Sequence, residues 1–220
     1  MRKLYSAIQM LFLSVALSAV GSVITNIASL QSMGNLMTIA GGIMTIVALY
    51  SLRFENQHFS KSLRLFWISA GMILLMSVIA AVALVSLNED TSLAGAIAMA
   101  AAVIITGIAA VVLEIMTQYQ FYKGLDVMRE ARAIDYPAKK IMWCFYLAII
   151  SMIISLIAVL SLMPSLFAAG EEAAASSVLA VGNVLLVVSV VMEAIHLWLI
   201  FTYMQATREA LEQEQSSGWG

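Results

Sequence analysis

The sequence predicts an all-α integral membrane protein, a bundle of six transmembrane helices. The first observation is composition: 62% of the 220 residues are hydrophobic and 11% are charged, against about 25% charged in an average soluble domain. A soluble domain of this length cannot bury so much apolar surface, whereas a lipid bilayer can cover it. The second observation is a series of long apolar runs, and the third is the placement of basic residues between them.

Each apolar run has close to the length that crosses a membrane. The runs lie at about 4–27, 35–52, 64–87, 93–119, 141–163 and 177–204. About 20 residues cross the hydrocarbon core, and only the second run is clearly short. None alternates with the period of two that barrel strands show, so we expect helices. Arg2 and Lys3 before the first run resemble a signal peptide, with a passable cleavage site at Ala16-Leu17-Ser18. Because the run continues through Ile24, we expect an uncleaved helix, with cleavage as the alternative.

The eleven basic residues lie in the segments that would share one side of the membrane, with Arg64 at the start of the third helix. They are Arg2, Lys3, Arg53, Lys61, Arg64, Lys123, Arg129, Arg132, Lys139, Lys140 and Arg208. The opposite loops, 28–34, 88–92 and 164–176, contain none and carry Glu89, Asp90, Glu171 and Glu172. Lys and Arg stay on the cytoplasmic side during insertion. We therefore predict a plasma (cytoplasmic) membrane protein with its N-terminus and C-terminus in the cytoplasm.

The fourth and sixth helices are expected to extend beyond the bilayer into the cytoplasm. After the fourth run, Tyr122, Leu125 and Met128 recur at helical spacing among charged residues, and Pro137 is expected to stop the helix. The sixth run is followed by a charged segment with no helix breaker before Ser216. We expect a single transmembrane domain over residues 1–215 and a disordered tail over 216–220.

The chain also shows signs of an internal repeat of three helical hairpins in the same orientation. At an offset of 79 residues, Val111-Val112-Leu113-Glu114 falls on Val190-Val191-Met192-Glu193, and Arg129-Glu130-Ala131 falls on Arg208-Glu209-Ala210. The third and fifth helices align at an offset of 76, which places Trp67 on Trp143. The first hairpin fits more loosely. Such repeats are common in transport folds, while chance similarity between Ala/Val/Leu-rich helices is the alternative.

Few strongly polar side chains occur within the apolar runs. Glu114 lies in the fourth helix with Gln118 at i+4, and Glu193 lies in the sixth with His196 at i+3. An ionisable group in hydrocarbon costs several kcal/mol and normally faces the bundle interior or a wet cavity. Because the repeat alignment gives the two glutamates equivalent depth, we predict that these four residues form one substrate or ion site. Thr45 occupies the equivalent position in the first hairpin, so the site would be asymmetric.

Three interpretations of this cluster stay open. It is a cation or proton site in a transport pathway, because a low dielectric disfavours the charged carboxylate and allows proton exchange near neutral pH. It is half of a metal site, since Glu193-x-x-His196 has the spacing of di-iron bundles. The chain has only two histidines, and His58 lies in a predicted cytoplasmic loop, so we expect no metal. In the third interpretation the residues are structural, hydrogen-bonded across helices or extended toward the cytoplasm.

Small and aromatic residues suggest how the helices pack. Ser14, Ser18 and Ser22 recur every four residues, and Gly41-Gly42 lie in the second helix. Such faces allow close helix approach, either within the chain, as we expect, or against a partner protein. The large aromatic residues near the cytoplasmic ends are predicted to form an interfacial belt: Trp67, Trp143, Trp198, Tyr5, Tyr50, Tyr119 and Tyr203.

No motif of an enzyme is present in the sequence. It lacks a Walker motif, a Gly-x-Ser-x-Gly elbow, a His-Glu-x-x-His pair and a dinucleotide fingerprint, so we expect neither catalysis nor a cofactor. The lone Cys144 cannot form an internal disulfide or a thiolate metal cluster. The loops are too short and too mixed in charge for nucleic-acid binding.

Two functions remain as predictions. The chain is a small transporter, or a substrate-binding transporter subunit, for a small solute or ion. Alternatively, it is a non-catalytic accessory or scaffold protein that acts through helix–helix and cytoplasmic contacts. The expected partners are the lipid bilayer and a second copy or a membrane partner subunit. The first function predicts a cavity lined by Glu114, Glu193 and His196, and the second predicts that these residues are hydrogen-bonded within a packed interior.

Overall fold

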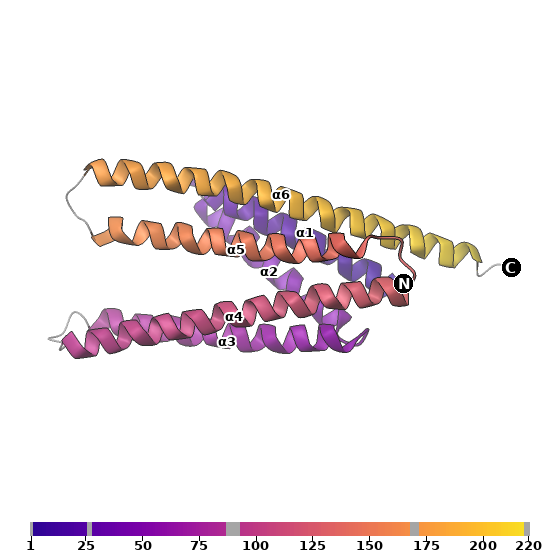
Figure 1. Cartoon of the computed structure of the whole chain (residues 1–220), viewed down its shortest axis with the longest axis horizontal. Coiled ribbons are helices and arrows are strands. Elements are labelled where there is room, and N and C mark those ends of the chain that lie inside the picture. The colour runs from indigo at the N-terminus through magenta and orange to yellow at the C-terminus, as the bar shows by residue number, and fades with distance from the viewer. Residues whose placement is uncertain (1, 26–27, 87–92, 168–171, 218–220) are drawn as a thin grey trace. The chain divides into compact units, whose positions relative to one another are not determined.

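The computed structural model describes residues 2–25, 28–86, 93–167 and 172–217, which contain helices and no strand. Within those ranges it leaves out some side chains, chiefly those of residues 158–183. The elements are α1 (Arg2–Thr25), a short 3-10 helix (Ala28–Leu30), α2 (Gln31–Leu52), α3 (Gln57–Ser86), α4 (Leu93–Ala131), α5 (Ala138–Phe167) and α6 (Glu172–Ser217) (Figure 1). Each of the six predicted runs is therefore helical over its described residues, and the second helix begins earlier than predicted, at Gln31.

Within the residues that the structure describes, four helices are long and apolar enough to cross a membrane. They are α1, α2, the Gln57–Val82 part of α3 and the Ala101–Ala131 part of α4. Their large apolar side chains are widely exposed, as at Leu36, Leu74 and Ile105, which suits contact with lipid. Much of the apolar part of α5 and α6 lies outside the described side chains, so spanning by these two helices stays a prediction. The acidic residues Glu89, Asp90 and Glu171 also lie outside the described residues.

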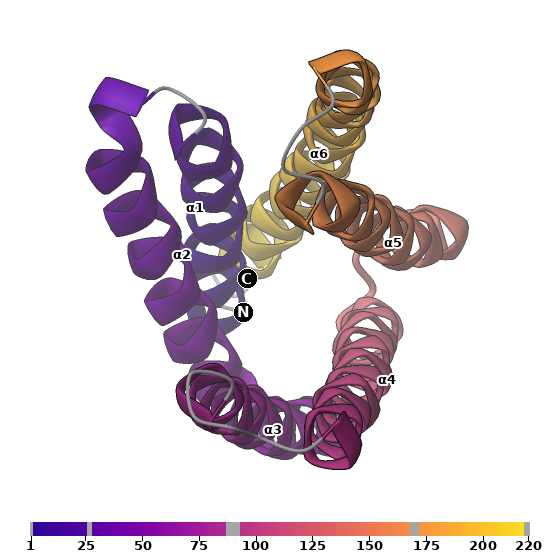
Figure 2. The same cartoon turned by 90° about the vertical axis from the view of Figure 1, so that its left-hand side faces the viewer.

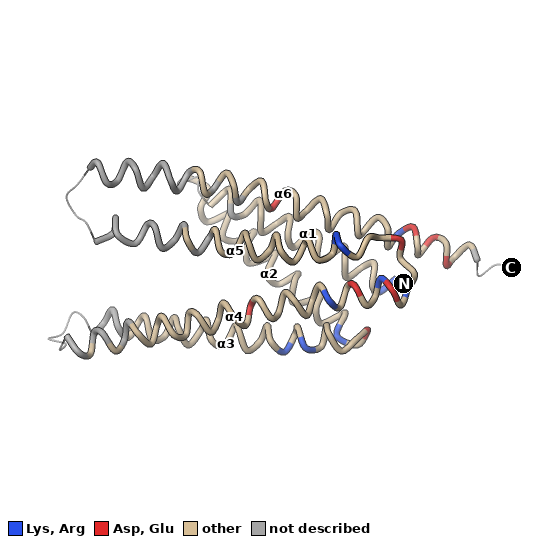
Figure 3. Tube along the Cα trace, viewed as in Figure 1, with Lys and Arg blue, Asp and Glu red and all other residues tan. Residues whose placement is uncertain are grey.

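The chain folds as two compact units. The first unit comprises Met1–Leu52 and Leu125–Gly220, and the second comprises Arg53–Gly124, so that α4 passes from one to the other at Gly124. Within each unit, Lys and Arg gather toward one end of the helices (Figure 3). The single domain over 1–215 stays a prediction. At the C-terminus, α6 includes Ser216 and Ser217, and residues 218–220 lie outside the description.

In the first unit, α1 and α2 form an antiparallel pair joined along a seam of small residues (Figure 2). The seam consists of Ser14, Ser18, Gly21 and Thr25 on α1 and Gly34, Thr38, Gly41 and Thr45 on α2. The spacing alternates between four and three residues, which keeps one face of each helix toward its partner. A Cβ on Gly34 would lie 2.6 Å from the backbone nitrogen of Thr25. The two backbones therefore touch, and only glycine fits.

The seam confirms the expectation that the small-residue stripe packs within the chain. The Ser14 hydroxyl bonds both the Gly41 carbonyl oxygen and the Thr45 hydroxyl. Ser18 contacts the position where Gly41 would carry a Cβ. Gly21 continues the face, while the side chain of Ser22 lies outside the described residues.

The second unit is the α3–α4 hairpin. Asn56 caps α3, because its side-chain oxygen accepts hydrogen bonds from the backbone nitrogens of His58 and Phe59. The Asn56 amide nitrogen also donates to the carbonyl oxygen of Gly124 at 3.0 Å. Phe59 is fully buried, and a Cβ on Gly124 would lie 2.8 Å from its ring. The cap of one helix is thus tied directly to the backbone of the other, with Gly124 making room for the ring.

The end of α4 differs from the prediction. Pro137 does not stop the helix, because α4 already ends at Ala131. The backbone nitrogen of Ile134 donates to the Arg129 carbonyl at 3.0 Å, and that of Ala133 donates to Glu130 at 3.3 Å. With Ala133 at a φ of 47°, this is a Schellman motif with alanine where glycine is usual. A local hydrogen-bonding pattern, which carries no strong sequence signal without glycine, ends the helix.

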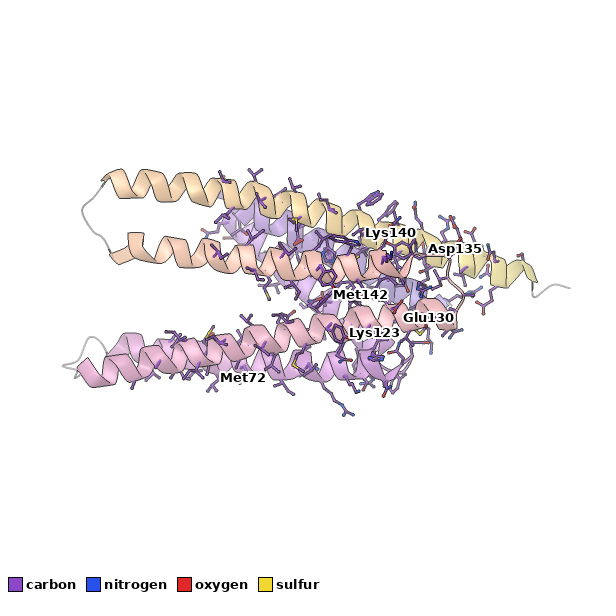
Figure 4. The ribbon with its side chains drawn as sticks, viewed as in Figure 1. Met72, Lys123, Glu130, Asp135, Lys140 and Met142 are labelled. Atoms are coloured by element: carbon purple, nitrogen blue, oxygen red, sulfur yellow. The ribbon has the colours of Figure 1, made fainter. Side chains whose placement is uncertain are left out.

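One of the predicted belt aromatics is a core residue. Tyr203 is 3% exposed, and its hydroxyl donates to the Leu125 carbonyl at 3.1 Å. Its ring meets the Tyr136 ring edge-on, and the Tyr136 hydroxyl donates to the Leu199 carbonyl at 3.0 Å. Lys140, at the start of α5, places its ammonium 5.7 Å from the centre of the Tyr136 ring (Figure 4). Tyr203 was therefore wrong as a belt residue, because its hydroxyl finds a backbone acceptor inside the first unit.

Candidate functional site

The four predicted site residues lie on two helices, and the two pairs fall in different units. Glu114 and Gln118 are on α4 within the second unit, and Glu193 and His196 are on α6 within the first. Each pair can be described within its own unit. The predicted convergence of Glu114 with Glu193 stays a prediction.

The Glu114–Gln118 pair is satisfied along its own helix. The amide nitrogen of Gln118 donates to a Glu114 carboxylate oxygen at 2.8 Å. Both side chains are half-buried. The neighbouring Thr117 is buried and donates to the Leu113 carbonyl one turn back. These contacts match the structural interpretation for this half of the cluster.

Glu193 instead faces a groove between α1 and α6. The groove has a volume of about 260 Å³ and is lined by Ala19, Val20, Val23 and Ile24 of α1 and by Val190, Glu193, Ala194 and Leu197 of α6. Glu193 is the one ionisable residue among these lining side chains. Val20, Val23 and Val190 are between 41% and 47% exposed, so the groove opens on the surface of its unit.

Helix register and side-chain size explain this groove. The rings of Phe12 and Phe201 pack 5.7 Å apart, which ties α1 to α6. Eight residues onward along α1 is Val20, and eight residues back along the antiparallel α6 is Glu193, about 12 Å from the aromatic contact. At that level each helix presents an alanine, Ala19 and Ala194. Two short side chains leave space that the valines and Leu197 surround.

The Glu193 carboxylate has neither a hydrogen bond nor an ion pair with the part of the chain that the structure describes. Its side chain is half-buried. His196, one turn further along α6, is 8% exposed and interacts with its surroundings, and it does not line the groove. Of the four predicted residues, Glu193 is the one that lines this groove.

Metal coordination finds no further support in this arrangement. Within the described residues, no three His, Cys, Asp or Glu side chains come together as they would around a metal ion. Cys144 is a buried thiol on α5. Glu193 and His196 have the spacing of a metal-ligand pair, and within the described residues no third such ligand joins them.

The α1 wall of the groove was not predicted from the sequence. Ala19, Val20, Val23 and Ile24 occupy one helical face, but apolar residues extend around most of α1, so hydropathy alone does not mark it. The available signal was the pair of alanines among larger residues at the level of an unpaired carboxylate. Recognising it requires the α1–α6 register, which only the folded chain supplies.

Comparison with known proteins adds no relative: no protein-family model, no curated protein and no solved structure matches this chain.

Proposed function

We propose that this chain is a six-span plasma-membrane protein that binds a small solute or ion at Glu193, as a small transporter or as the substrate-binding subunit of one. The observation that carries the proposal is a carboxylate without a partner among the described residues, facing an open groove between apolar helices. A carboxylate at membrane depth is costly and is usually paired or functional. Glu193 lines the groove, and no described residue pairs with its carboxylate.

The position of Glu193 along α6 supports this proposal. The sixth span is expected to end near residue 204, eleven residues after Glu193, which corresponds to about 16 Å of helix. That is roughly half the thickness of the hydrocarbon core. Transport sites commonly lie near the bilayer midplane. Both termini would be cytoplasmic, because all eleven basic residues lie in alternate segments of the six-span topology.

In this proposal the two glutamates have different roles. Glu114 is held by Gln118 and stabilises its own helix. Glu193 binds the solute. The three hairpins would be repeats that have diverged. The carboxylate of Glu193 would bind the solute, and that of Glu114 would serve only to stabilise its helix.

A scaffold function is the second candidate, and one observation favours it. α6 continues to Ser217 with Arg208, Glu209 and Glu212 exposed, as a charged helical extension that a cytoplasmic protein could bind. Arg208 is paired with Glu212 at 2.8 Å on the helix surface. A scaffold would use this extension and would have no need of the groove.

Solute-dependent stabilisation or uptake tests the proposal. Purified protein in nanodiscs is screened against small solutes by thermal shift, and the hits are measured for uptake into proteoliposomes. We expect a hit for the wild type that is lost in Glu193→Gln and kept in Glu114→Gln, the matched control in the other unit. A panel in which Glu193→Gln responds like the wild type throughout would remove the support for transport and favour the scaffold.

The six-span topology has its own test. Single cysteines are introduced at Asp90 and at Arg132 in a Cys144→Ser background, and intact cells are treated with a membrane-impermeant maleimide. We expect labelling at position 90 and protection at position 132. Equal labelling of both positions would contradict the topology and, with it, the midplane placement of Glu193.

A further inference from the structure

We propose that the α1–α6 groove binds a hydrophobic organic monocation, whose charge pairs with Glu193 and whose apolar body lies against Val20, Val23, Ile24 and Leu197. This inference rests on the proposed function and names its substrate class. It follows from three properties of the groove: its charge, its donor set and its size.

The charge of the lining selects against anions. Glu193 is the one charged residue among the lining side chains, and it meets neither Lys nor Arg there. An anion placed beside it would be repelled, and the low dielectric of the surroundings would strengthen that repulsion. A neutral ligand would leave the carboxylate desolvated and unpaired, which is costly. A single positive charge satisfies Glu193 and leaves the complex neutral.

The donor set selects against inorganic cations. Ca²⁺ takes six to eight oxygen ligands and Mg²⁺ takes six in a near-octahedral arrangement. The groove offers one carboxylate, and its other lining side chains are alanine, valine, isoleucine and leucine. A bare metal ion would lose most of its hydration shell without replacement. A quaternary or bulky ammonium group is weakly hydrated, because its charge is already surrounded by carbon.

The size and the walls of the groove suit a small organic molecule. Its volume of about 260 Å³ lies just below the usual range for small-molecule pockets, roughly 300–1,000 Å³. Val20, Val23 and Val190 are each exposed along the rim, so the groove opens on the surface of its unit. At membrane depth that surface faces apolar surroundings. A cation with its own hydrophobic body can partition there, whereas a strongly hydrated one cannot.

The test uses benzyltrimethylammonium and its neutral carbon isostere, neopentylbenzene, which have nearly the same shape. Full-length protein is placed in nanodiscs of zwitterionic lipid, and binding of radiolabelled benzyltrimethylammonium is measured by equilibrium dialysis. We expect saturable binding that neopentylbenzene does not displace. Glu193→Gln should weaken it by roughly tenfold or more, because the charge-assisted contact is lost. Glu114→Gln, in the other unit, should bind as the wild type does.

A second variant tests the groove independently, in case Glu193→Gln loses binding because it misfolds. Ala194→Phe keeps the carboxylate and fills the groove from an exposed position. It should also abolish binding while remaining monodisperse.

The other outcomes separate the two proposals. If Na⁺, Mg²⁺ or a neutral solute binds in a Glu193-dependent manner and benzyltrimethylammonium does not, the substrate class is wrong and the proposed function stands. Displacement by neopentylbenzene with equal potency would also overturn the substrate class, because it would mean that the positive charge does not contribute to binding. If no solute distinguishes the wild type from Glu193→Gln or Ala194→Phe, both proposals fail.

Discussion

The Ser14 hydroxyl of α1 donates a hydrogen bond to the carbonyl oxygen of Gly41 on α2, with 2.8 Å between the two oxygens. Gly41 also packs so closely against Ser14 and Ser18 that a Cβ would overlap both residues. Its neighbour Gly42 faces the other way and has open space beside it. Substitution by alanine should therefore have opposite effects on stability at these two adjacent glycines.

Gly41→Ala should destabilise the α1–α2 pair by about 1–3 kcal/mol, as overpacking in a tight core does. A Cβ at Gly41 would lie 2.8 Å from the Ser14 carbonyl oxygen, and backbone atoms cannot move aside cheaply. Gly42→Ala should be neutral or stabilise by about 0.5–1 kcal/mol, because alanine favours the helix. Unfolding in mixed micelles measures both variants. Equal losses would contradict the seam.

Ala133→Gly should raise the free energy of unfolding by about 0.5–1 kcal/mol. Ala133 has a φ of 47°, in the left-handed region that costs an L-residue about 1–2 kcal/mol, and part of the relief is offset by the greater freedom of glycine in the unfolded chain. Ala131→Gly, in the last helical position of α4, is the control and should lower stability by roughly 0.5–1 kcal/mol. Thermal denaturation of the two variants in one detergent gives the comparison, and a loss for Ala133→Gly would argue against the Schellman ending.

Ser69→Ala should stabilise the α3–α4 hairpin by about 1 kcal/mol. The Ser69 hydroxyl is 2% exposed and has no hydrogen-bond partner in the described chain, so its burial costs free energy that alanine would not incur. Ser62 is the matched control, because its hydroxyl donates to the Thr117 carbonyl at 3.0 Å. Ser62→Ala should destabilise by about 1 kcal/mol. Equilibrium unfolding measures both variants. If both substitutions changed the free energy of unfolding in the same direction, the presence of a hydrogen-bond partner would not explain the effect.

Alkaline pH should weaken the contact of Tyr136 with α6. Burial raises the pKa of the Tyr136 hydroxyl above its ordinary value of 10.0, partly offset by the hydrogen bond with Thr202. The unfolded chain therefore loses this proton first, so the stabilisation is fully present below about pH 10 and declines as pH rises toward the folded pKa. Tyr136→Phe should cost about 1 kcal/mol at pH 8. It should also show a shallower fall in stability as pH rises above about 10. If stability fell equally steeply with pH in the variant and the wild type, Tyr136 would not be the group responsible.

Much of the fold was predictable because the membrane imposes it. Apolar length alone located each of the helices, since backbone groups in lipid must be satisfied within a helix. The extension of α4 beyond its apolar run was predicted from Tyr122, Leu125 and Met128, and these side chains are buried. The way α4 ends was not predicted, because Ala133 carries no glycine signal for a left-handed residue.

The site was predictable only in part, for a related reason. Glu193 stood out because a carboxylate is conspicuous in an apolar run, and so did Glu114. Their different surroundings did not stand out. Gln118 at i+4 is a neighbour that any helix creates, whereas the space beside Glu193 depends on Ala19, a residue far away in the chain.

By itself, the sequence determined where the helices lie, that at least four of them can cross a membrane, and which few ionisable side chains they carry. Tertiary structure decided which faces meet: that Gly41 and not Gly42 forms the seam, that Tyr203 is internal, and that Ala19 lies opposite Ala194 to open a groove at Glu193. The physical reason is that hydropathy reports transfer into lipid, which is nearly the same for every face of an apolar helix. Close packing depends on the register of side-chain sizes between helices that are distant in the chain.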